Sequence, residues 1–149
     1  MGSKQQTILF NKLTKLCPKL FFHSDFRPDF LKNVETGNNL EIDIWNSKFK
    51  IGFEFQGGVH FKHIGKYKND PDKSRKHDLK KYDLINKKHL KATIIEIFET
   101  DLNGDDFRGI LTQRLVNTLI YYNSDPKRHK YKIKTLKKFI KYINDDFIK

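Results

Sequence analysis

Acidic and amide side chains lie in two short apolar segments near the middle of the chain. Asp43 lies in LEIDIW, and Glu54 and Gln56 lie in IGFEFQ. Because side chains alternate along a strand, Glu54 and Gln56 are expected to share one face. A turn over residues 47–50 would form a hairpin that places Asp43 roughly opposite Glu54. Two converging carboxylates in an otherwise basic protein predict a divalent-metal site, suited to Mg²⁺ or Mn²⁺, that works on a phosphate backbone.

Glu41 shares the predicted face of Asp43 but lies nearer the end of its strand. It is therefore expected either to support the metal ligands from outside or to form a salt bridge with Lys48 or Lys50. The sequence leaves both interpretations open.

Alternation by itself also fits an ordinary hairpin with a polar outer face. In either case Ile42 and Ile44 are expected to lie together on the face opposite Asp43. The strand at 49–56 is flanked by aromatic residues and should be well buried. A buried lone carboxylate such as Glu54 is costly unless it is paired or bound to metal. The metal site is therefore the favoured interpretation.

Histidine and lysine side chains near these strands could take part in proton or phosphate chemistry. His60 follows the pair Gly57-Gly58, which should end the second strand. A neutral imidazole there could accept a proton near neutral pH or contact phosphate, and an ordinary surface position is the alternative. Lys80 and Lys81 lie in a lysine-rich predicted helix, where either a solvated face or a contact with substrate phosphate fits.

Positive charge is the second strong feature of the chain. The 149 residues carry a formal charge of +12, concentrated in residues 62–91 and 126–149. These clusters predict nucleic acid or another polyanion as partner, and lysine favours phosphate contacts over base reading. Solubility in a lysine-rich composition is the alternative.

Cysteine content and hydropathy bound the setting. The single Cys17 excludes an internal disulfide and fits a reducing intracellular compartment, whether cytoplasm, an organelle or a virus-infected cell. No apolar run approaches the roughly 18 residues that span a membrane, so no membrane partner is expected.

Periodicity predicts a single domain of the α/β class, with a mixed β-sheet flanked by helices. The core is expected over about residues 5–122, and a basic helical C-terminal extension over about 126–149. Segments 23–39 and 60–72 read as loops. Helices are expected within 5–22, where Pro18 should end the helix, from Asp72 to His89, over 107–122 and in the extension, and a central strand is expected at 92–98 because it is nearly continuous in apolar residues.

Three stretches of the first half match one known pattern. They are RPDFLKN at 27–33, TGNNLEIDI at 36–44 and FEFQGGVH at 53–60. Together they resemble the PD-(D/E)XK nuclease superfamily, and they look most like its very-short-patch-repair-like and homing-endonuclease-like branches. The resemblance continues through DLKK and IIEI and covers about residues 27–98.

The resemblance implies a restriction-endonuclease-like core and metal-dependent hydrolysis of phosphodiester bonds. Asp43 and Glu54 would match the metal-binding acids of the family, and Gln56 stands where the family usually has lysine. That lysine generally orients the attacking water and stabilises developing charge, whereas an amide can orient water but adds no positive charge. Lys80 or Lys81 could restore the charge.

The combined hypothesis is a Mg²⁺- or Mn²⁺-dependent DNA endonuclease, in which His60 moves the proton and Lys80 assists Gln56. A non-catalytic nucleic-acid-binding protein that retains the fold is the alternative, and an RNA-directed nuclease is a third. Cutting both strands would favour a homodimer with two sites. The residues expected to contact nucleic acid are Lys62, Lys66, Lys68, Lys73, Arg75, Lys76, Lys81, Lys130, Lys134, Lys137 and Lys138.

Overall fold

A computed structural model describes residues 3–56, Leu84 and residues 91–145. This part of the chain is mixed α/β, with three helices and a four-stranded mixed sheet. The helices are α1 (Lys4–Leu16), α4 (Phe107–Tyr122) and α5 (Lys130–Asn144), the strands are β1 (His23–Phe26), β2 (Ile42–Asn46), β3 (Ile51–Gln56) and β4 (Thr93–Phe98), and the 3₁₀ turns are η1 (Asp29–Leu31) and η2 (Glu99–Leu102).

The four strands lie in the order β1-β2-β3-β4. The first three are consecutive antiparallel neighbours, whereas β4 runs parallel to β3. The β2–β3 hairpin turns over residues 47–50, as the sequence predicts, and Lys50 has a positive φ of 53° there. Because β4 runs parallel to β3, with Ile51 opposite Thr93 and Gln56 opposite Phe98, both strands begin at the same end of the sheet.

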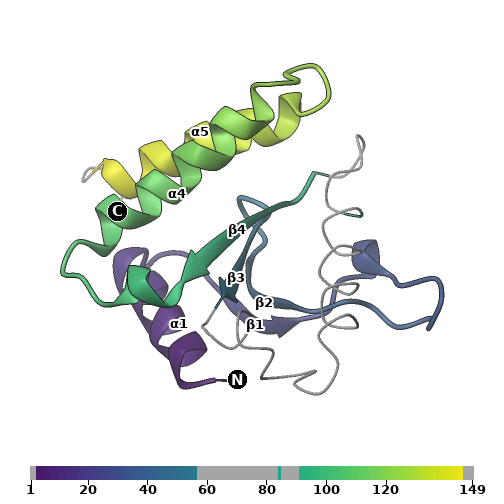
Figure 1. Cartoon of the computed structure of the whole chain (residues 1–149), viewed down its shortest axis with the longest axis horizontal. Helices are drawn as coiled ribbons and strands as arrows, with labels where there is room; N and C mark the ends of the chain where they lie inside the picture. The colour runs from purple at the N-terminus through teal and green to yellow at the C-terminus, as the bar shows by residue number, and fades with distance from the viewer. Residues whose placement is uncertain (1–2, 57–83, 85–90, 146–149) are drawn as a thin grey trace.

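The main hydrophobic core fills the space between one face of the sheet and the three helices. Figure 1 shows α4 and α5 side by side along the sheet. Phe53 of β3 and Phe139 of α5 are fully buried, with ring centroids 6.2 Å apart. Leu9 of α1 and Leu111 of α4 join the same cluster. The C-terminal helix is therefore part of the core, to which it contributes Ile133, Leu136, Phe139, Tyr142 and Ile143.

A smaller core lies on the other face of the sheet, around Trp45 and Ile94. The ring of Trp45 stacks on Phe26, with centroids 5.4 Å apart and an interplanar angle of 11°. Gly52 of β3 lies against this cluster, and a Cβ atom at that position would lie only 2.7 Å from Cγ2 of Ile42. Close packing thus requires glycine inside β3.

Several predicted elements are confirmed. Helix α1 ends at Leu16, just before Pro18, and α4 has the predicted bounds 107–122. The hairpin strands, the strand at 92–98 and the helix in the C-terminal extension are also present. The predicted loop at 60–72 lies outside the described residues, and so does the predicted helix from Asp72 to His89 except for Leu84, which is helical.

Two predictions about the sheet are wrong. The predicted loop at 23–39 contains β1, a short polar strand whose pairing with β2 is a non-local interaction that local periodicity does not reveal. The predicted central strand β4 lies at the edge of the four-stranded sheet that the described residues form. Its apolar sequence reflects core clusters on both of its faces, and coverage of the faces is independent of how many strands flank it.

Regular alternation fails at Asp43, contrary to prediction. Ile42 packs in the Trp45 cluster and Ile44 in the main core, so the two isoleucines do not share a face. The neighbouring strand is irregular at the same level, where Asp25 of β1 has a positive φ of 53°. The β2–β3 ladder runs from Asn46 to Ile44 and stops before Asp43. The acid therefore lies where the sheet becomes irregular.

Candidate functional site

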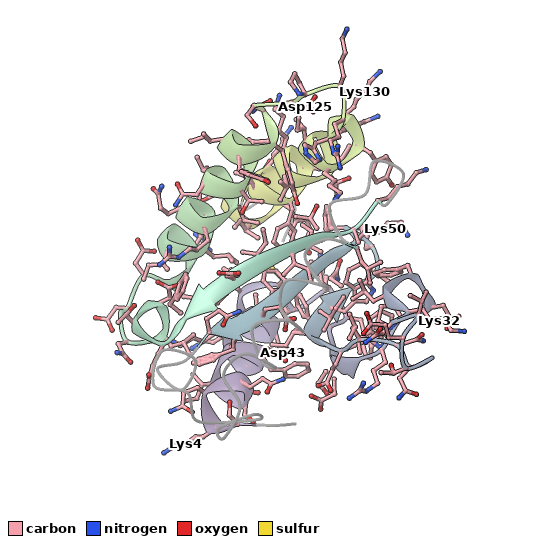
Figure 2. The ribbon with its side chains drawn as sticks, turned by 45° about the vertical axis from the view of Figure 1, so that its right-hand side comes forward. Lys4, Lys32, Asp43, Lys50, Asp125 and Lys130 are labelled. Atoms are coloured by element: carbon pink, nitrogen blue, oxygen red, sulfur yellow. The ribbon has the colours of Figure 1, made fainter. Side chains whose placement is uncertain are left out.

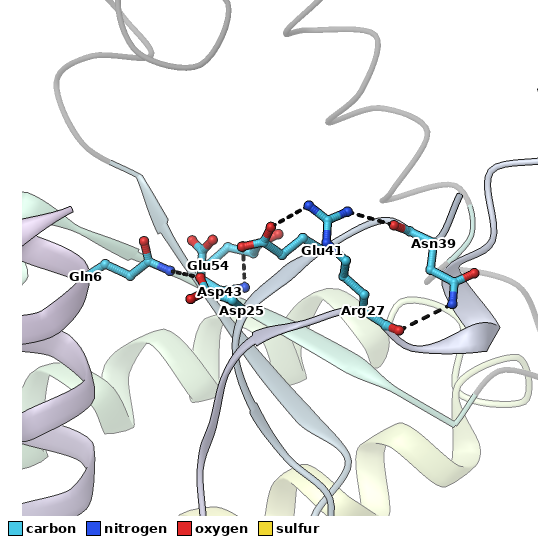
Figure 3. A network of polar contacts seen from close by, with 7 residues as sticks. All are labelled: Gln6, Asp25, Arg27, Asn39, Glu41, Asp43 and Glu54. Carbon is cyan, nitrogen blue, oxygen red and sulfur yellow. Dashed lines mark hydrogen bonds and ion pairs between the residues drawn. The ribbon is translucent and has the colours of Figure 1, made fainter. Parts of the chain in front are cut away.

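Asp43 and Glu54 lie level with each other on β2 and β3. Ile44 pairs with Phe53, and the next position outward brings the two acids opposite one another. Glu54 Oε2 accepts a hydrogen bond from the backbone N–H of Asp43 at 3.2 Å (Figure 3). Asp43 Oδ2 accepts one from the backbone N–H of Phe55 at 2.9 Å. Each carboxylate is therefore held by the backbone of the opposite strand.

Asp25 and Glu96 extend this pair into a row of four carboxylates, one on each strand. Glu96 pairs with Glu54 in the parallel β3–β4 register, and the β1–β2 register places Asp25 level with Asp43. Glu54 is buried, with 5% of its surface exposed, and Asp43 and Glu96 are half-buried. Like charges opposite one another destabilise a sheet. A cation at this row, called here the carboxylate row, would relieve the repulsion.

Glu41 forms an ion pair with Arg27, whose Nη2 lies 2.8 Å from Glu41 Oε2 (Figure 3). The predicted partners Lys48 and Lys50 are thus replaced by a residue that follows β1, because the pairing of β1 with β2 brings Arg27 beside Glu41. Burial and a hydrogen bond with Asp25 raise the pKa of Glu41, against the opposing charge of Arg27. Glu41 therefore joins the acidic row to a basic group at its rim.

Two amide side chains lie near the row. Gln6 of α1 is buried, donates from Nε2 to Asp25 Oδ1 at 3.4 Å, and completes a capping box with Ser3 at the start of the helix. Gln56 is half-buried at the end of β3, two residues beyond Glu54. Strand geometry puts Gln56 on the face of Glu54, as the sequence predicts.

The carboxylate row offers only oxygen atoms as ligands to a metal ion. Within residues 3–56 and 91–145, no group of three or more His, Cys, Asp or Glu side chains is placed to hold a metal. A metal would thus be bound by the two carboxylates of Asp43 and Glu54, with water and phosphate oxygens as its other ligands. Mg²⁺ commonly binds in this way, and hydrogen bonds from N–H groups orient both carboxylates. The donor chemistry fits Mg²⁺ or Mn²⁺.

Most of the residues predicted to contact phosphate lie outside the described part of the chain. His60, Lys62, Lys66, Lys68, Lys73, Arg75, Lys76, Lys80 and Lys81 lie outside the described residues. On α5, four predicted nucleic-acid contacts are exposed, namely Lys130, Lys134, Lys137 and Lys138. Figure 2 shows Lys130 at one end of the helical pair, well apart from Asp43. The structure therefore does not bring Lys130 to the carboxylate row.

Sequence reasoning missed Asp25, Glu96 and Gln6. Glu96 had a signal, since it is the single acid within the apolar strand TIIEIF, and parallel pairing with β3 makes it a neighbour of Glu54. Asp25 had none, because its strand was read as a loop. Gln6 lies in a helix far from the hairpin in sequence, so only tertiary packing reveals it.

An ion pair between buried Asp101 and half-buried Arg114 fixes the end of β4. Both oxygens of Asp101 accept hydrogen bonds from Arg114, at 2.9 Å from Nε and 2.8 Å from Nη2, and Oδ2 also accepts from the N–H of Phe98. Burial raises the pKa of Asp101, but the hydrogen bonds from Arg114 and Phe98 and the charge of Arg114 outweigh burial, so the net pKa is lowered. The Arg114 guanidinium lies over the Phe98 ring, 4.7 Å from its centroid. The pair joins α4 to the strand that carries Glu96.

Comparison with known proteins finds two relatives in invertebrate iridescent viruses. The chain is 32% identical over 103 residues to Uncharacterized protein 307L of Invertebrate iridescent virus 6, a match that covers 66% of this chain and 51% of that protein. It is 51% identical over 35 residues to Uncharacterized protein 033L of Invertebrate iridescent virus 3, covering 24% of this chain and 18% of that protein. The chain thus spans about half the length of the first relative and less than a fifth of the second.

Neither family models nor solved structures match the chain. None of the helices in the described residues is both long enough and apolar enough to cross a membrane.

Proposed function

We propose that this protein is a Mg²⁺- or Mn²⁺-dependent DNA endonuclease with Asp43 and Glu54 as its metal ligands. The observation that carries the proposal is the reciprocal bonding of these two carboxylates across the hairpin. They are oriented by backbone N–H groups, and they lie in a row of like charges that a cation would neutralise. The chain as a whole, these acids included, carries a net charge of +12, which would attract a polyanionic substrate.

Each group near the row has a role in this proposal. When bound, a divalent ion supplies a water of lowered pKa and positive charge for the phosphate in the transition state. Gln56 would orient the water through its amide oxygen. The charge that Gln56 lacks would come from Lys80, and His60 would take up the proton, as expected from the sequence.

The order of the elements also supports the proposal. An N-terminal helix precedes three antiparallel strands, and a fourth strand is parallel to the third. The two candidate metal ligands lie on adjacent strands of this sheet. A restriction-endonuclease-like core, which the resemblance of residues 27–98 implies, would account for this arrangement, with residues 1–149 as one nuclease domain.

The direct test is cleavage of labelled duplex, single-stranded and four-way-junction DNA with Mg²⁺, with Mn²⁺ and with EDTA. Asp43→Asn and Glu54→Gln keep the size of the side chain but remove a charged metal ligand, so each should abolish metal-dependent cleavage. Glu99→Gln is the matched control, because Glu99 is an exposed acid just beyond β4. Cleavage that survives in EDTA, or in both ligand variants, would refute the assignment.

A non-catalytic nucleic-acid-binding protein is the alternative, and Gln56 in place of the family's lysine favours it. This alternative predicts tight DNA binding without cleavage, and an affinity that Glu54→Gln leaves unchanged. Labelled RNA in the same assay tests the RNA-directed nuclease. Gel filtration with light scattering tests the homodimer that cutting both strands would favour.

The relatives suggest where the protein acts. Both relatives are proteins of iridescent viruses, and Cys17, the single cysteine of the sequence, is buried. We therefore place the proposed activity in a reducing compartment of a virus-infected cell.

A further inference from the structure

A basic hollow lies at the connection between α4 and α5. It is lined by Lys127, Arg128, His129, Lys130, Lys132 and Lys134, together with a tyrosine ring. Figure 2 shows Asp125 and Lys130 at this end of the helical pair, away from Asp43 in the sheet. This α5 hollow is therefore a different place from the carboxylate row.

The start of helix α5 opens into the hollow. His129 is the N-cap residue, its side chain makes no capping hydrogen bond, and the first turn contains no acidic residue. N–H groups and the positive end of the helix dipole attract anions at such a helix start. Here cationic side chains reinforce the same field.

His129 provides an independent sign of a binding site. The residue is only 7% exposed, and its Nδ1 atom has no hydrogen-bond partner among the described residues. Its ring packs on Tyr122, with centroids 4.5 Å apart. Burial and the charges of Lys132 and Arg128 lower the pKa of His129, with Asp125 opposing. An unpartnered buried nitrogen is rare in folded proteins, and an oxygen ligand in the hollow would satisfy it.

Lys132 lies beneath the same hollow and is only 2% exposed. Its Nζ atom lies 5.4 Å from the centroid of the Tyr122 ring. Burial and the charge of Arg128 lower the pKa of Lys132 to about 8, so the ammonium form still dominates at pH 7. Because burial disfavours the charged form of this side chain, a bound anion would favour it. Helical spacing turns Lys132 toward Tyr122 of α4, whereas Lys130 and Lys134 of the same helix are exposed.

We propose that the α5 hollow binds a phosphate group, and that this phosphate belongs to the backbone of a nucleic acid. Lys132 would meet the phosphate from below, His129 would donate from Nδ1, and exposed cations such as Lys130 would surround it at the rim. Phosphate binding is inferred from the hollow alone. The assignment of that phosphate to a nucleic acid rests on the proposed function. The hollow would hold the substrate at a distance from the carboxylate row.

The first experiment titrates inorganic phosphate into the metal-free protein at constant ionic strength, and follows the His129 ring by NMR. Saturable changes at His129 and a rise in its pKa are expected in the wild type and in Lys141→Met, but not in Lys132→Met. Lys141 is the matched control because it is an exposed lysine of α5 that does not line the hollow. No saturable change, or equal changes in all three proteins, would overturn the site.

The second experiment measures duplex DNA binding in EDTA across a salt series. Lys132→Met should weaken affinity roughly tenfold and reduce the slope of log affinity against log salt by about 0.9, whereas Lys141→Met should change the slope less. Inorganic phosphate should also compete with DNA for the wild type. Phosphate binding without any effect of Lys132→Met on DNA would overturn the assignment to nucleic acid.

Neither experiment contains a divalent metal or requires cleavage. Failure of the proposed nuclease, seen as intact DNA in the presence of Mg²⁺, is thus distinguishable from failure of the phosphate site. Circular dichroism of Lys132→Met should show the wild-type helix content, because methionine fills the buried space that the lysine stem occupies.

Discussion

Asp43 and Glu54 hold each other in place across the β2–β3 hairpin. The carboxylate of Glu54 accepts from the backbone of Asp43, and the carboxylate of Asp43 accepts from the residue that follows Glu54. These two carboxylates lie where the regular backbone ladder between β2 and β3 stops, one residue beyond the pair of Ile44 and Phe53. The irregularity of the sheet and the convergence of the acids are therefore one structural feature.

Divalent metal should stabilise the wild-type protein through this pair. A ligand that binds only the folded state adds about 2.7 kcal/mol to the free energy of unfolding at 100 times its dissociation constant. Glu54→Gln should lose this gain, because the amide cannot replace a charged ligand. Thermal denaturation with and without Mg²⁺ measures it. Glu99→Gln should keep the wild-type gain, and an equal gain in Glu54→Gln would contradict Glu54 as a ligand.

Gln56→Lys should raise the rate of metal-dependent cleavage. Lysine would add the positive charge that the amide lacks, near the end of the strand that carries Glu54, and one group that stabilises transition-state charge is worth roughly a hundredfold to a thousandfold in rate. Single-turnover cleavage measures the rate. Gln113→Lys, at an exposed position on α4, controls for added net charge. A protein that neither variant activates, and that never cuts, is better described as a binding module.

Asp101→Asn should destabilise the fold in a pH-dependent way. The pKa of Asp101 is lower in the folded protein than in the unfolded chain, so its contribution is fully present above the unfolded pKa. That contribution is lost as pH falls through the folded pKa. At pH 7 the variant should lose about 1–3 kcal/mol of unfolding free energy, because charged hydrogen bonds to Arg114 are weakened.

Urea denaturation at pH 7 and at pH 3 measures the effect. The difference between Asp101→Asn and the wild type should shrink at the lower pH. Asp105→Asn is the control, since Asp105 is an exposed acid of the same turn. A difference of the same size at both pH values would show that packing, rather than charge, accounts for the loss.

Lys132→Met should stabilise the metal-free and phosphate-free protein at pH 7. The folded pKa of Lys132 is about 8, below its value in the unfolded chain, so folding disfavours the charged form. Wild-type stability should therefore rise with pH from about 8 up to the unfolded pKa near 10.4, as protons leave the buried group. The variant lacks this rise, and its advantage, of order 1–3 kcal/mol, should be greatest below pH 8.

Guanidinium denaturation from pH 6 to pH 10 tests the sign. Lys141→Met, which removes an exposed lysine from the same helix, should follow the wild type at each pH. A Lys132→Met protein that is less stable than the wild type at pH 7 would show that the buried lysine contributes to folding. In that case its burial would not be a cost that a ligand offsets.

Local patterns were sufficient for the helices and for the hairpin. Helical spacing of leucines and a following proline predicted α1, and the alternation of apolar and polar residues around Phe53 predicted β3. These signals are local, because a helix buries a stripe of residues that recur every three or four positions and a strand buries every second one. The acidic pair was predictable for the same reason, since a short turn sets the hairpin register.

Long-range pairing decided what lies around that pair. Asp25 reached the row because the polar segment at 23–26 pairs with β2, and Glu96 reached it because β4 runs parallel to β3. Glu41 forms its ion pair with Arg27 because β1 pairs with β2. None of these contacts has a local signature, because hydrogen bonds between distant strands depend on the whole sheet.

Sequence by itself determined the acids, their spacing and the positive charge of this protein. Only the tertiary structure decided which charged groups are buried and what they meet. Lys132 and Lys141 look alike in the sequence, yet packing of α5 on α4 buries the first beside His129 and leaves the second exposed. The physical reason is that burial depends on the residues that distant elements bring together, whereas charge and spacing belong to the chain itself.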